Sequence, residues 1–299
     1  MDILALGEPL VEFNNTGGST FEYGFGGDVS NTIIAAARMG AQVGIWTRLG
    51  ADRFGDDLRA MWDAEGVDHS SATAAPGEDT GVYFVVHGPD GHEFLYRRAG
   101  SASARMGPGD LPAIPLNDAQ ILHVSGISQA ISASAEALVD AAAQAMKARG
   151  GWVSYDPNHR PKLWSLDHAR QAVARLAGMS DFLLPGLDDA QVLTGLDDAQ
   201  DIVRHYRDNG ARVVALTMGP DGVLLGEGAS ITHIPAVPVT AIDATGAGDC
   251  FDGVFLARIA AGDTAVDAAT LAARVASLST QKFGAVPSYP TKAQVLGAA

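Results

Sequence analysis

The sequence has one cysteine, few cations and no long apolar run. Cys250 by itself excludes an intrachain disulfide framework, and a lone cysteine is typical of a protein kept in a reducing cytoplasm. Lysine and arginine total 20 against 35 aspartate and glutamate residues, which gives a net charge of −15. Without a basic cluster, nucleic acid is not an expected partner. No stretch approaches about 20 consecutive apolar residues, so we expect no membrane span.

Two further signals are missing near the N-terminus. The chain runs from Met1 directly into an apolar segment without a basic region, so we expect no secretory signal and a cytoplasmic location. No Gly-x-Gly-x-x-Gly follows this first apolar segment, which disfavours a dinucleotide-binding dehydrogenase.

Strand-like and helix-like segments alternate along most of the chain. Short runs rich in Val, Leu and Ile are each followed by a segment of helical periodicity, most regularly from residue 120 to residue 217. This alternation predicts an α/β fold, in which helices cover both faces of a doubly wound, mostly parallel sheet. With 299 residues, the chain could form one α/β domain or one domain with a small appendage, and we expect a single domain over residues 1–299.

Two segments, at about residues 11–25 and 81–98, interrupt this rhythm. In each, apolar and polar residues alternate on both sides of a turn, the second turn being expected at Gly88–Gly91. This pattern is typical of antiparallel strands with one exposed face. The two segments therefore predict a small antiparallel β lid inserted in the α/β body. We expect the segment that follows, Gly100–Ser103, to be flexible.

The most informative stretch is Asp243–Phe251, which contains the glycine-rich run Thr-Gly-Ala-Gly-Asp. Extended residues precede it and helical spacing follows it, so the run leads into a helix N-terminus. Such a terminus presents free backbone N–H groups and the positive end of the helix dipole, which suit a phosphate. Asp249 would be a poor phosphate ligand but a suitable base for a hydroxyl that attacks phosphorus. In the alternative interpretation, Asp249 is an ordinary helix N-cap.

A second glycine turn, Gly26-Gly27-Asp28, enters another predicted helix in which Asn31 follows three residues later. Residues three apart share one face of a helix, so Asp28 and Asn31 are placed to bind the hydroxyl groups of a polyol together. The alternative makes Asp28 an N-cap and Asn31 a surface residue. Ligands of parallel sheets bind beyond the carboxyl ends of the strands. In this chain those ends are rich in glycine, proline and polar residues: Gly126-Ile127, Asp156–Arg160, Pro185-Gly186, Met218-Gly219 and the Asp243 motif.

These two glycine motifs, in this order, resemble the two signatures of the ribokinase/PfkB family of sugar kinases. Three further stretches, Ser125–Ile127, Asn158–Trp164 and Phe94–Arg98, resemble the 2-keto-3-deoxygluconate kinases within that family. The resemblance covers essentially the whole chain, residues 1–299. It implies a ribokinase-like α/β body with a β lid, and transfer of the γ-phosphate of ATP to a sugar hydroxyl.

The resemblance also implies roles for individual residues. Asp249 would be the catalytic base, and the amides of Gly246, Ala247 and Gly248 would form the anion hole. Sugar contacts would come, together with Asp249, from Gly27, Asp28, Asn31, Tyr83, Tyr96, Arg97, Ile127 and Arg160. Whether Arg97 or Arg98 reaches the sugar stays open. Because guanidinium groups bind carboxylates bidentately, we expect a sugar acid, 2-keto-3-deoxygluconate above all, phosphorylated on its terminal hydroxyl.

ATP and Mg²⁺ are the implied cofactors, and K⁺ stays open as a third. Nucleotide contacts would come from Thr217, Gly219, Asp221 and Gly222, although a simple β-turn explains this loop equally well. A monovalent cation would be held by Asp243, Thr245, Ser279, Gly284 and Ser288. Relatives carry Asn-x-x-Glu where this chain has Gly186–Asp189, so Asp189 would contact Mg²⁺ through water. Ala273 replaces an adenine-side Asn of some relatives, which leaves the nucleotide preference open.

Other functions are compatible with the same motifs. The sugar could instead be 2-keto-3-deoxygalactonate, ribose, fructose or a nucleoside, or the chain could be a sugar-binding homologue without catalysis. The expected partners are a small sugar acid, ATP and a second copy of the chain, paired through the exposed lid.

Overall fold

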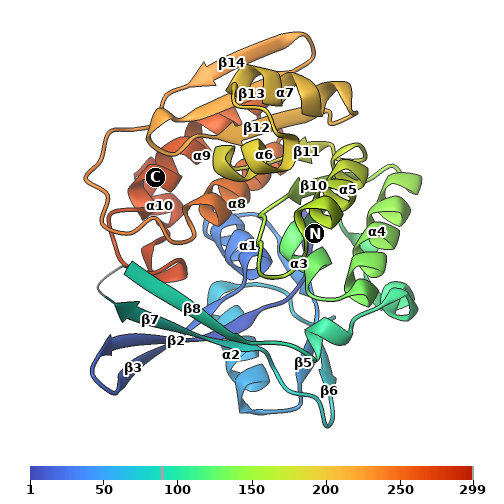
Figure 1. Cartoon of the computed structure of the whole chain (residues 1–299), viewed down its shortest axis with the longest axis vertical. Coiled ribbons are helices and arrows are strands. Elements are labelled where there is room, and N and C mark those ends of the chain that lie inside the picture. Colours follow the sequence, from blue (N-terminus) through green and yellow to red (C-terminus); the bar gives the residue numbers. More distant parts are fainter. Residues whose placement is uncertain (89–90, 298–299) are drawn as a thin grey trace.

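The computed structural model describes residues 1–88 and 91–297, and within them the main sheet has eight strands (Figure 1). Their order is β14-β13-β12-β11-β10-β9-β1-β4. The bounds are β1 Ile3–Leu6, β4 Val43–Trp46, β9 Ile121–Ser125, β10 Trp152–Asp156, β11 Phe182–Leu183, β12 Val213–Thr217, β13 Val223–Glu227 and β14 Ser230–Ile234. The pairs from β12 to β4 are parallel, while β12–β13 and β13–β14 are antiparallel. The predicted mostly parallel sheet is thereby confirmed.

Helices cover the two faces of this sheet. Along β1, Ile3 and Ala5 belong to one apolar core and Leu4 and Leu6 to the other, as the alternation of a strand requires. The first core is closed by α1 (Asp28–Arg38), α2 (Arg53–Glu65), α8 (Ala247–Ala260) and α9 (Ala265–Ser279). The second is closed by α4 (Ala133–Ala148), α5 (Leu166–Ala177), α6 (Leu187–Thr194) and α7 (Ala199–Asp208). Short helices α3 (Gly126–Ala130) and α10 (Lys292–Leu296) complete the described set.

A second sheet lies at the lower left of Figure 1, in the order β3-β2-β7-β8. Its strands are β2 Leu10–Gly17, β3 Thr20–Gly26, β7 Val82–Gly88 and β8 Gly91–Arg97. Both predicted hairpins are present, but β2 pairs in parallel with β7, which joins the hairpins into one mixed four-stranded sheet. Pro89 and Asp90, in the second predicted turn, lie outside the described residues. A two-stranded parallel sheet, β5 (Arg48–Gly50) and β6 (Thr73–Ala75), flanks it.

The segment Gly100–Ser103 is not the flexible connection that we expected. Ser101, Ala102 and Ser103 are buried. The hydroxyl of Ser101 donates to Glu8 Oε1 at 2.6 Å, and the amide of Ala102 donates to the carbonyl of Asp79. These polar contacts anchor the segment where the second sheet rejoins the body.

The second sheet stands over the carboxyl ends of β1, β9 and β10. The N-termini of α1 and α8 reach the same edge of the main sheet. In the part of the chain that the structure describes, no helix combines the length and apolarity that crossing a lipid bilayer would require.

Candidate active site

A cavity of about 410 Å³ lies between the second sheet and the edge of the main sheet. This volume is in the range of small-molecule binding sites. The second sheet contributes Leu10, Tyr83, Phe94 and Tyr96, with Arg98 just after it; the body contributes Glu8, Gly27, Asp28, Asn31, Ile127, Asn158, Arg160, Pro161, Lys162, Leu163, Thr245, Gly246, Asp249 and Ala285. The two signature motifs therefore meet in one cavity, although they lie more than 200 residues apart in the sequence.

The glycine-rich motif forms the N-terminus of α8, and Gly246 is its N-cap residue. Gly246 has a φ of +72°, and a Cβ there would collide with Ala285 and the Tyr289 hydroxyl, so this position requires glycine. No side chain caps the helix, and Asp249 lies in its first turn rather than at the cap. The interpretation of Asp249 as an N-cap is therefore wrong.

This helix end leaves backbone donors free for an anion. Among the described residues, the N–H groups of Gly248 and Asp249 have no acceptor, as expected for a first helical turn. A Cβ at Gly248 would meet nothing within 4 Å, so the turn is open to a ligand. The amide of Ala247, which we expected in the anion hole, instead donates to the carbonyl of Ala244 at 3.1 Å. Ala247 is thus occupied within the turn.

Asp249 projects from α8 into the cavity and is held by a neighbouring amide. Asn31 Nδ2 on α1 donates to Asp249 Oδ2 at 2.8 Å. Desolvation at the base of the cavity, and next the charge of Asp28, raise the pKa of Asp249 to about 7. Behind it, burial and the neighbouring carboxylates also raise the pKa values of Asp156 and Asp252. A carboxyl with a pKa near neutrality suits a general base.

Asp28 is paired with Asn158, a residue that the sequence analysis did not assign to the site. Asn158 Nδ2 donates to Asp28 Oδ2 at 3.2 Å, and Asn158 has a φ of +33°, which is uncommon for a residue other than glycine. Asp28 Oδ1 and Asn31 Oδ1 are buried and accept no hydrogen bond within the described residues. Gly27 is the N-cap of α1, so the interpretation of Asp28 as the N-cap is also wrong.

Of the two arginines between which the sequence left the choice open, Arg98 rather than Arg97 lines the cavity. Arg97 is exposed and donates to the carbonyl of Tyr96, whereas Arg98 is buried and lines the cavity. Arg98 forms an ion pair with the buried Glu8 and lies over the Tyr96 ring, 5.5 Å from its centroid. Side chains of a strand alternate between faces, so Arg98 shares the cavity face with Phe94 and Tyr96. This alternation was visible in the sequence.

Tyr83 and Tyr96 stack on the cavity side of the second sheet, with ring centroids 5.6 Å apart. The Tyr83 hydroxyl donates to Glu12, and burial followed by the charge of Glu12 raises the pKa of Tyr83 well above its ordinary value. Its ring rather than its hydroxyl is therefore available to a ligand. Ile127, at the start of α3, lines the opposite side as expected. Arg160 and Lys162 lie at the exposed rim.

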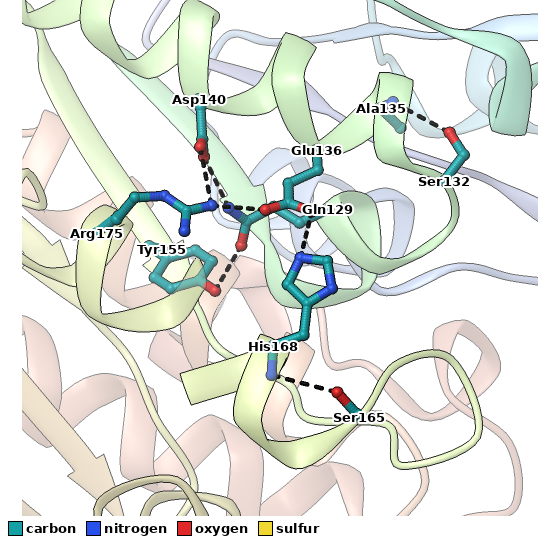
Figure 2. A network of polar contacts seen from close by, with 9 residues as sticks. All are labelled: Gln129, Ser132, Ala135, Glu136, Asp140, Tyr155, Ser165, His168 and Arg175. Carbon is teal, nitrogen blue, oxygen red and sulfur yellow. Dashed lines mark hydrogen bonds and ion pairs between the residues drawn. The ribbon is translucent and has the colours of Figure 1, made fainter. Parts of the chain in front are cut away.

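A polar network anchors the loop between β10 and α5 that carries Arg160 (Figure 2). Tyr155 donates to Gln129 Oε1 at 2.8 Å, and Gln129 Nε2 donates to Asp140 Oδ1 at 2.8 Å. Arg175 on α5 binds Glu136 and Asp140 of α4, at 2.6 and 3.3 Å. The element on each side of the loop is thus tied, directly or through Gln129, to α4. This anchoring fixes where the loop side chains enter the cavity.

Comparisons with known proteins agree with this geometry. Residues 9–292 match the model of the pfkB family carbohydrate kinases. The chain belongs to the pfkB family of carbohydrate kinases. A 2-dehydro-3-deoxygluconokinase of Thermoproteus tenax is 34% identical over 273 residues, 88% of this chain and 83% of that protein. Fructokinase-1 of Zea mays is 29% identical over 98% of this chain and 96% of its own length.

Solved structures of pfkB kinases have the same architecture. A PfkB protein from Polaromonas sp. JS666 superposes with a TM-score of 0.91 at 30% identity, covering 99% of both chains. Fructokinase from Vibrio cholerae O395, solved in a fructose, ADP and calcium ion bound form, gives a TM-score of 0.88 at 27% identity over 99% of this chain and 98% of that one. The expected ribokinase-like fold is confirmed, and the protein is an ATP-dependent carbohydrate kinase.

The loop expected to contact the nucleotide lies outside the cavity of this kinase. Thr217 ends β12, and Gly219–Asp221 forms an exposed 3₁₀ turn that Gly222 closes. Asp189 on α6 accepts a hydrogen bond from the amide of His159 at 2.9 Å and likewise does not line the cavity. In residues 1–88 and 91–297, no three His, Cys, Asp or Glu side chains gather closely enough to hold a metal ion.

Of the residues expected to hold a monovalent cation, Asp243, Thr245 and Gly284 are joined to one another by hydrogen bonds. Asp243 Oδ1 accepts hydrogen bonds from the amide and hydroxyl of Thr245, and Asp243 Oδ2 accepts one from the amide of Gly284 at 2.8 Å. Ser279 and Ser288 are buried, and their hydroxyls donate to the carbonyls of Ala276 and Ala285. Ala273 is buried on α9.

Proposed function

We propose that this kinase phosphorylates the terminal hydroxyl of 2-keto-3-deoxygluconate with ATP. The observation that carries the proposal is the buried guanidinium of Arg98 in the cavity. Its Nε has no hydrogen-bond partner within the described residues, so it remains available to a ligand. Arg160 and Lys162 bring two more cations to the rim of a protein with a net charge of −15. A sugar acid supplies the carboxylate that such donors bind best.

The hydroxyl groups of the sugar have their own acceptors. Asp28 Oδ1 and Asn31 Oδ1 are buried and unpartnered within the described residues, and both residues line the cavity. A sugar hydroxyl that donates to each would remove the cost of burying them unpaired. We propose that the second sheet acts as a lid, with the rings of Tyr83 and Tyr96 covering the apolar side of the sugar and excluding water.

In the reaction, Asp249 would take the proton of the attacking hydroxyl. The free amides of Gly248 and Asp249, at the positive end of α8, would stabilise the charge that develops on the transferring phosphoryl group. Mg²⁺ bound with ATP would neutralise phosphate charge, and Asp189 would contact it through water. Thr217, Gly219, Asp221 and Gly222 would contact the nucleotide, and Asp243 would order a K⁺ site with Thr245 and Gly284.

A fructokinase activity is the second candidate, because fructokinases match the chain over nearly the same length. The first experiment is ADP release from ATP and Mg²⁺ across a panel of 2-keto-3-deoxygluconate, its galactose epimer, gluconate, ribose, fructose and adenosine. We expect selective turnover of the keto-deoxy acids. Turnover of fructose alone would exclude the sugar-acid proposal, and silence throughout would favour a binding protein without catalysis.

The same assay tests the base. Asp249→Asn keeps the size of the side chain but cannot accept the proton, so we expect turnover to fall by about 10³-fold or more with the fold retained. Binding of the sugar acid, measured by calorimetry, should persist in this variant. Near-normal turnover would remove Asp249 from the mechanism.

We further propose that two copies of the kinase pair through the outer face of the lid, in the cytoplasm. On that face Tyr23, Phe13, Phe84 and Leu95 follow one another in register across the four strands. Tyr23 and Leu95 are 41% and 36% exposed, as is Phe21 at 41%. Helix α2 covers part of this face, because the Phe54 ring packs against Phe13 and Tyr23. The apolar side chains that remain exposed support pairing with a second copy.

A further inference from the structure

Asn31 joins the two signature helices, α1 and α8, through its hydrogen bond to Asp249. It lies in the first turn of α1, where its backbone amide donates to the carbonyl of Gly27 at 2.9 Å. Farther along, Gly253 of α8 faces α1 so closely that a Cβ there would collide with the carbonyl of Thr32 and the side chain of Ala35. The contact between Asn31 and Asp249 is therefore made between two helices that cannot easily move relative to each other.

The chemistry of this contact is directional. An ionised carboxylate only accepts hydrogen bonds, so the Nδ2 group of Asn31 must be the end that faces Asp249. The opposite end of the same amide, Oδ1, is buried without a partner among the described residues and belongs to a residue that lines the cavity. One side chain thus presents a donor to the carboxylate and an acceptor toward the ligand space.

Several charged and titratable groups surround Asp249 besides this amide. They are Asp28 on α1, Asp156 at the end of β10, Arg160 after it, Asp252 on α8, Tyr83 on β7 and Tyr289 after the last 3₁₀ turn. Of the two α1 residues, Asp28 raises the pKa of Asp249, whereas the hydrogen bond from Asn31 lowers it. Substitutions at these two positions should therefore act in opposite directions.

We infer that Asn31 is the positioning residue of the base: its amide holds Asp249 Oδ2 and leaves Oδ1 of Asp249 to accept the proton of the sugar hydroxyl. The inference rests on the proposed function, because it requires Asp249 to act as the base. It adds a role to Asn31 that binding of the sugar alone does not need.

The pH dependence of kcat/KM for the sugar tests this role, because it reports ionisations of the free enzyme. Activity should require ionised Asp249 and therefore fall as the pH drops through about 7. Asn31→Leu keeps a similar shape but removes the donor, so this acid limb should move to higher pH by about one unit. Asn31→Asp places a second carboxylate beside that of Asp249 and should move the acid limb to still higher pH. Asp28→Asn should move it to lower pH.

Asn158→Gly is the matched control. It also removes an amide that binds a cavity carboxylate, but Asp28 rather than Asp249, and glycine tolerates the positive φ at this position. We expect this variant to raise KM without moving the acid limb. Circular dichroism of each variant checks the fold, and the near-isosteric Asn31→Asp serves if Asn31→Leu does not fold.

The possible outcomes distinguish the role of Asp249 as the base from the role of Asn31 in positioning it. If Asp249→Asn is inactive and both Asn31 variants change KM with an unmoved acid limb, Asn31 binds sugar only and the positioning role is overturned. If Asp249→Asn is active, Asp249 is not the base and the positioning role of Asn31 falls with it, whereas turnover of the sugar acid by the wild-type protein would still support the proposed substrate. The inference is supported if the acid limb of kcat/KM moves to higher pH in both Asn31 variants and keeps its position in Asn158→Gly.

Discussion

At the scale of the residue, the cavity distinguishes two adjacent arginines. Arg98 is buried against Glu8 and faces the ligand space, while Arg97 is exposed on the opposite side of the strand. The two arginines are adjacent in the sequence and carry the same charge. A difference between their variants would therefore report contact with substrate rather than the general field of the protein.

We predict that Arg98→Lys raises the KM for the sugar acid about tenfold or more. Lysine keeps the charge and can keep the ion pair with Glu8, but it loses the planar fork that binds a carboxylate bidentately. Arg97→Lys is the matched control and should change KM less than twofold. Steady-state kinetics with 2-keto-3-deoxygluconate measure both, and equal effects of the two variants would contradict a carboxylate contact at Arg98.

Much of the site was predictable at this scale, because the chemistry lies in two short motifs. Asp249, Asp28 and Asn31 were identified from glycine turns and helical spacing, and the structure brings all three into one cavity. Asn158 and Glu8 were not identified, because each acts through a partner more than 80 residues away in the sequence. Nothing in the local sequence of Asn158 predicts its positive φ.

At the scale of the element, a buried polar network around α4 holds the loop between β10 and α5 in position. Tyr155 and Gln129 are both fully buried, and each satisfies the polar group of the other. Their contact joins β10 to α3, so the strand that leads into the loop is fixed in place (Figure 2).

We predict that Tyr155→Phe lowers the free energy of unfolding by about 1–2 kcal/mol, because it leaves Gln129 Oε1 buried without a donor. Tyr206→Phe is the matched control. The Tyr206 hydroxyl is buried on α7 and has no partner within the described residues, so its removal should be neutral or slightly stabilising. Urea denaturation measures both. Equal losses would mean that the Tyr155 hydrogen bond contributes nothing specific.

Elements were predictable where periodicity alone decides them. The alternation of strands and helices that the sequence predicts from residue 120 to residue 217 is present in the structure. The pairing of strands was harder to predict. Val11 pairs in parallel with Val82, about 70 residues away, and neither strand has a local sequence pattern that predicts this partner. The burial of Ser101, in a segment of small residues that suggested flexibility, comes from Glu8. Long-range partners decided both.

At the scale of the whole molecule, the outer face of the lid predicts the assembly. We expect a dimer in multi-angle light scattering at micromolar concentration. Leu95→Glu places a charge in the middle of the exposed row and should yield monomers. Val192→Glu, at an apolar position on α6 that is 46% exposed, is the control and should leave the mass unchanged. A monomeric wild-type protein would contradict the proposed pairing.

The burial of Cys250 has a practical consequence for following the lid. It is the only cysteine in the sequence, its side chain is fully buried in α8, and burial raises the pKa of its thiol to about 12. At neutral pH it is therefore shielded from maleimide reagents. A single Glu93→Cys substitution, at an exposed position on β8, would give the chain one reactive thiol without removing a native one. A fluorophore attached there would test whether the proposed lid closes over a bound ligand in an otherwise unaltered enzyme.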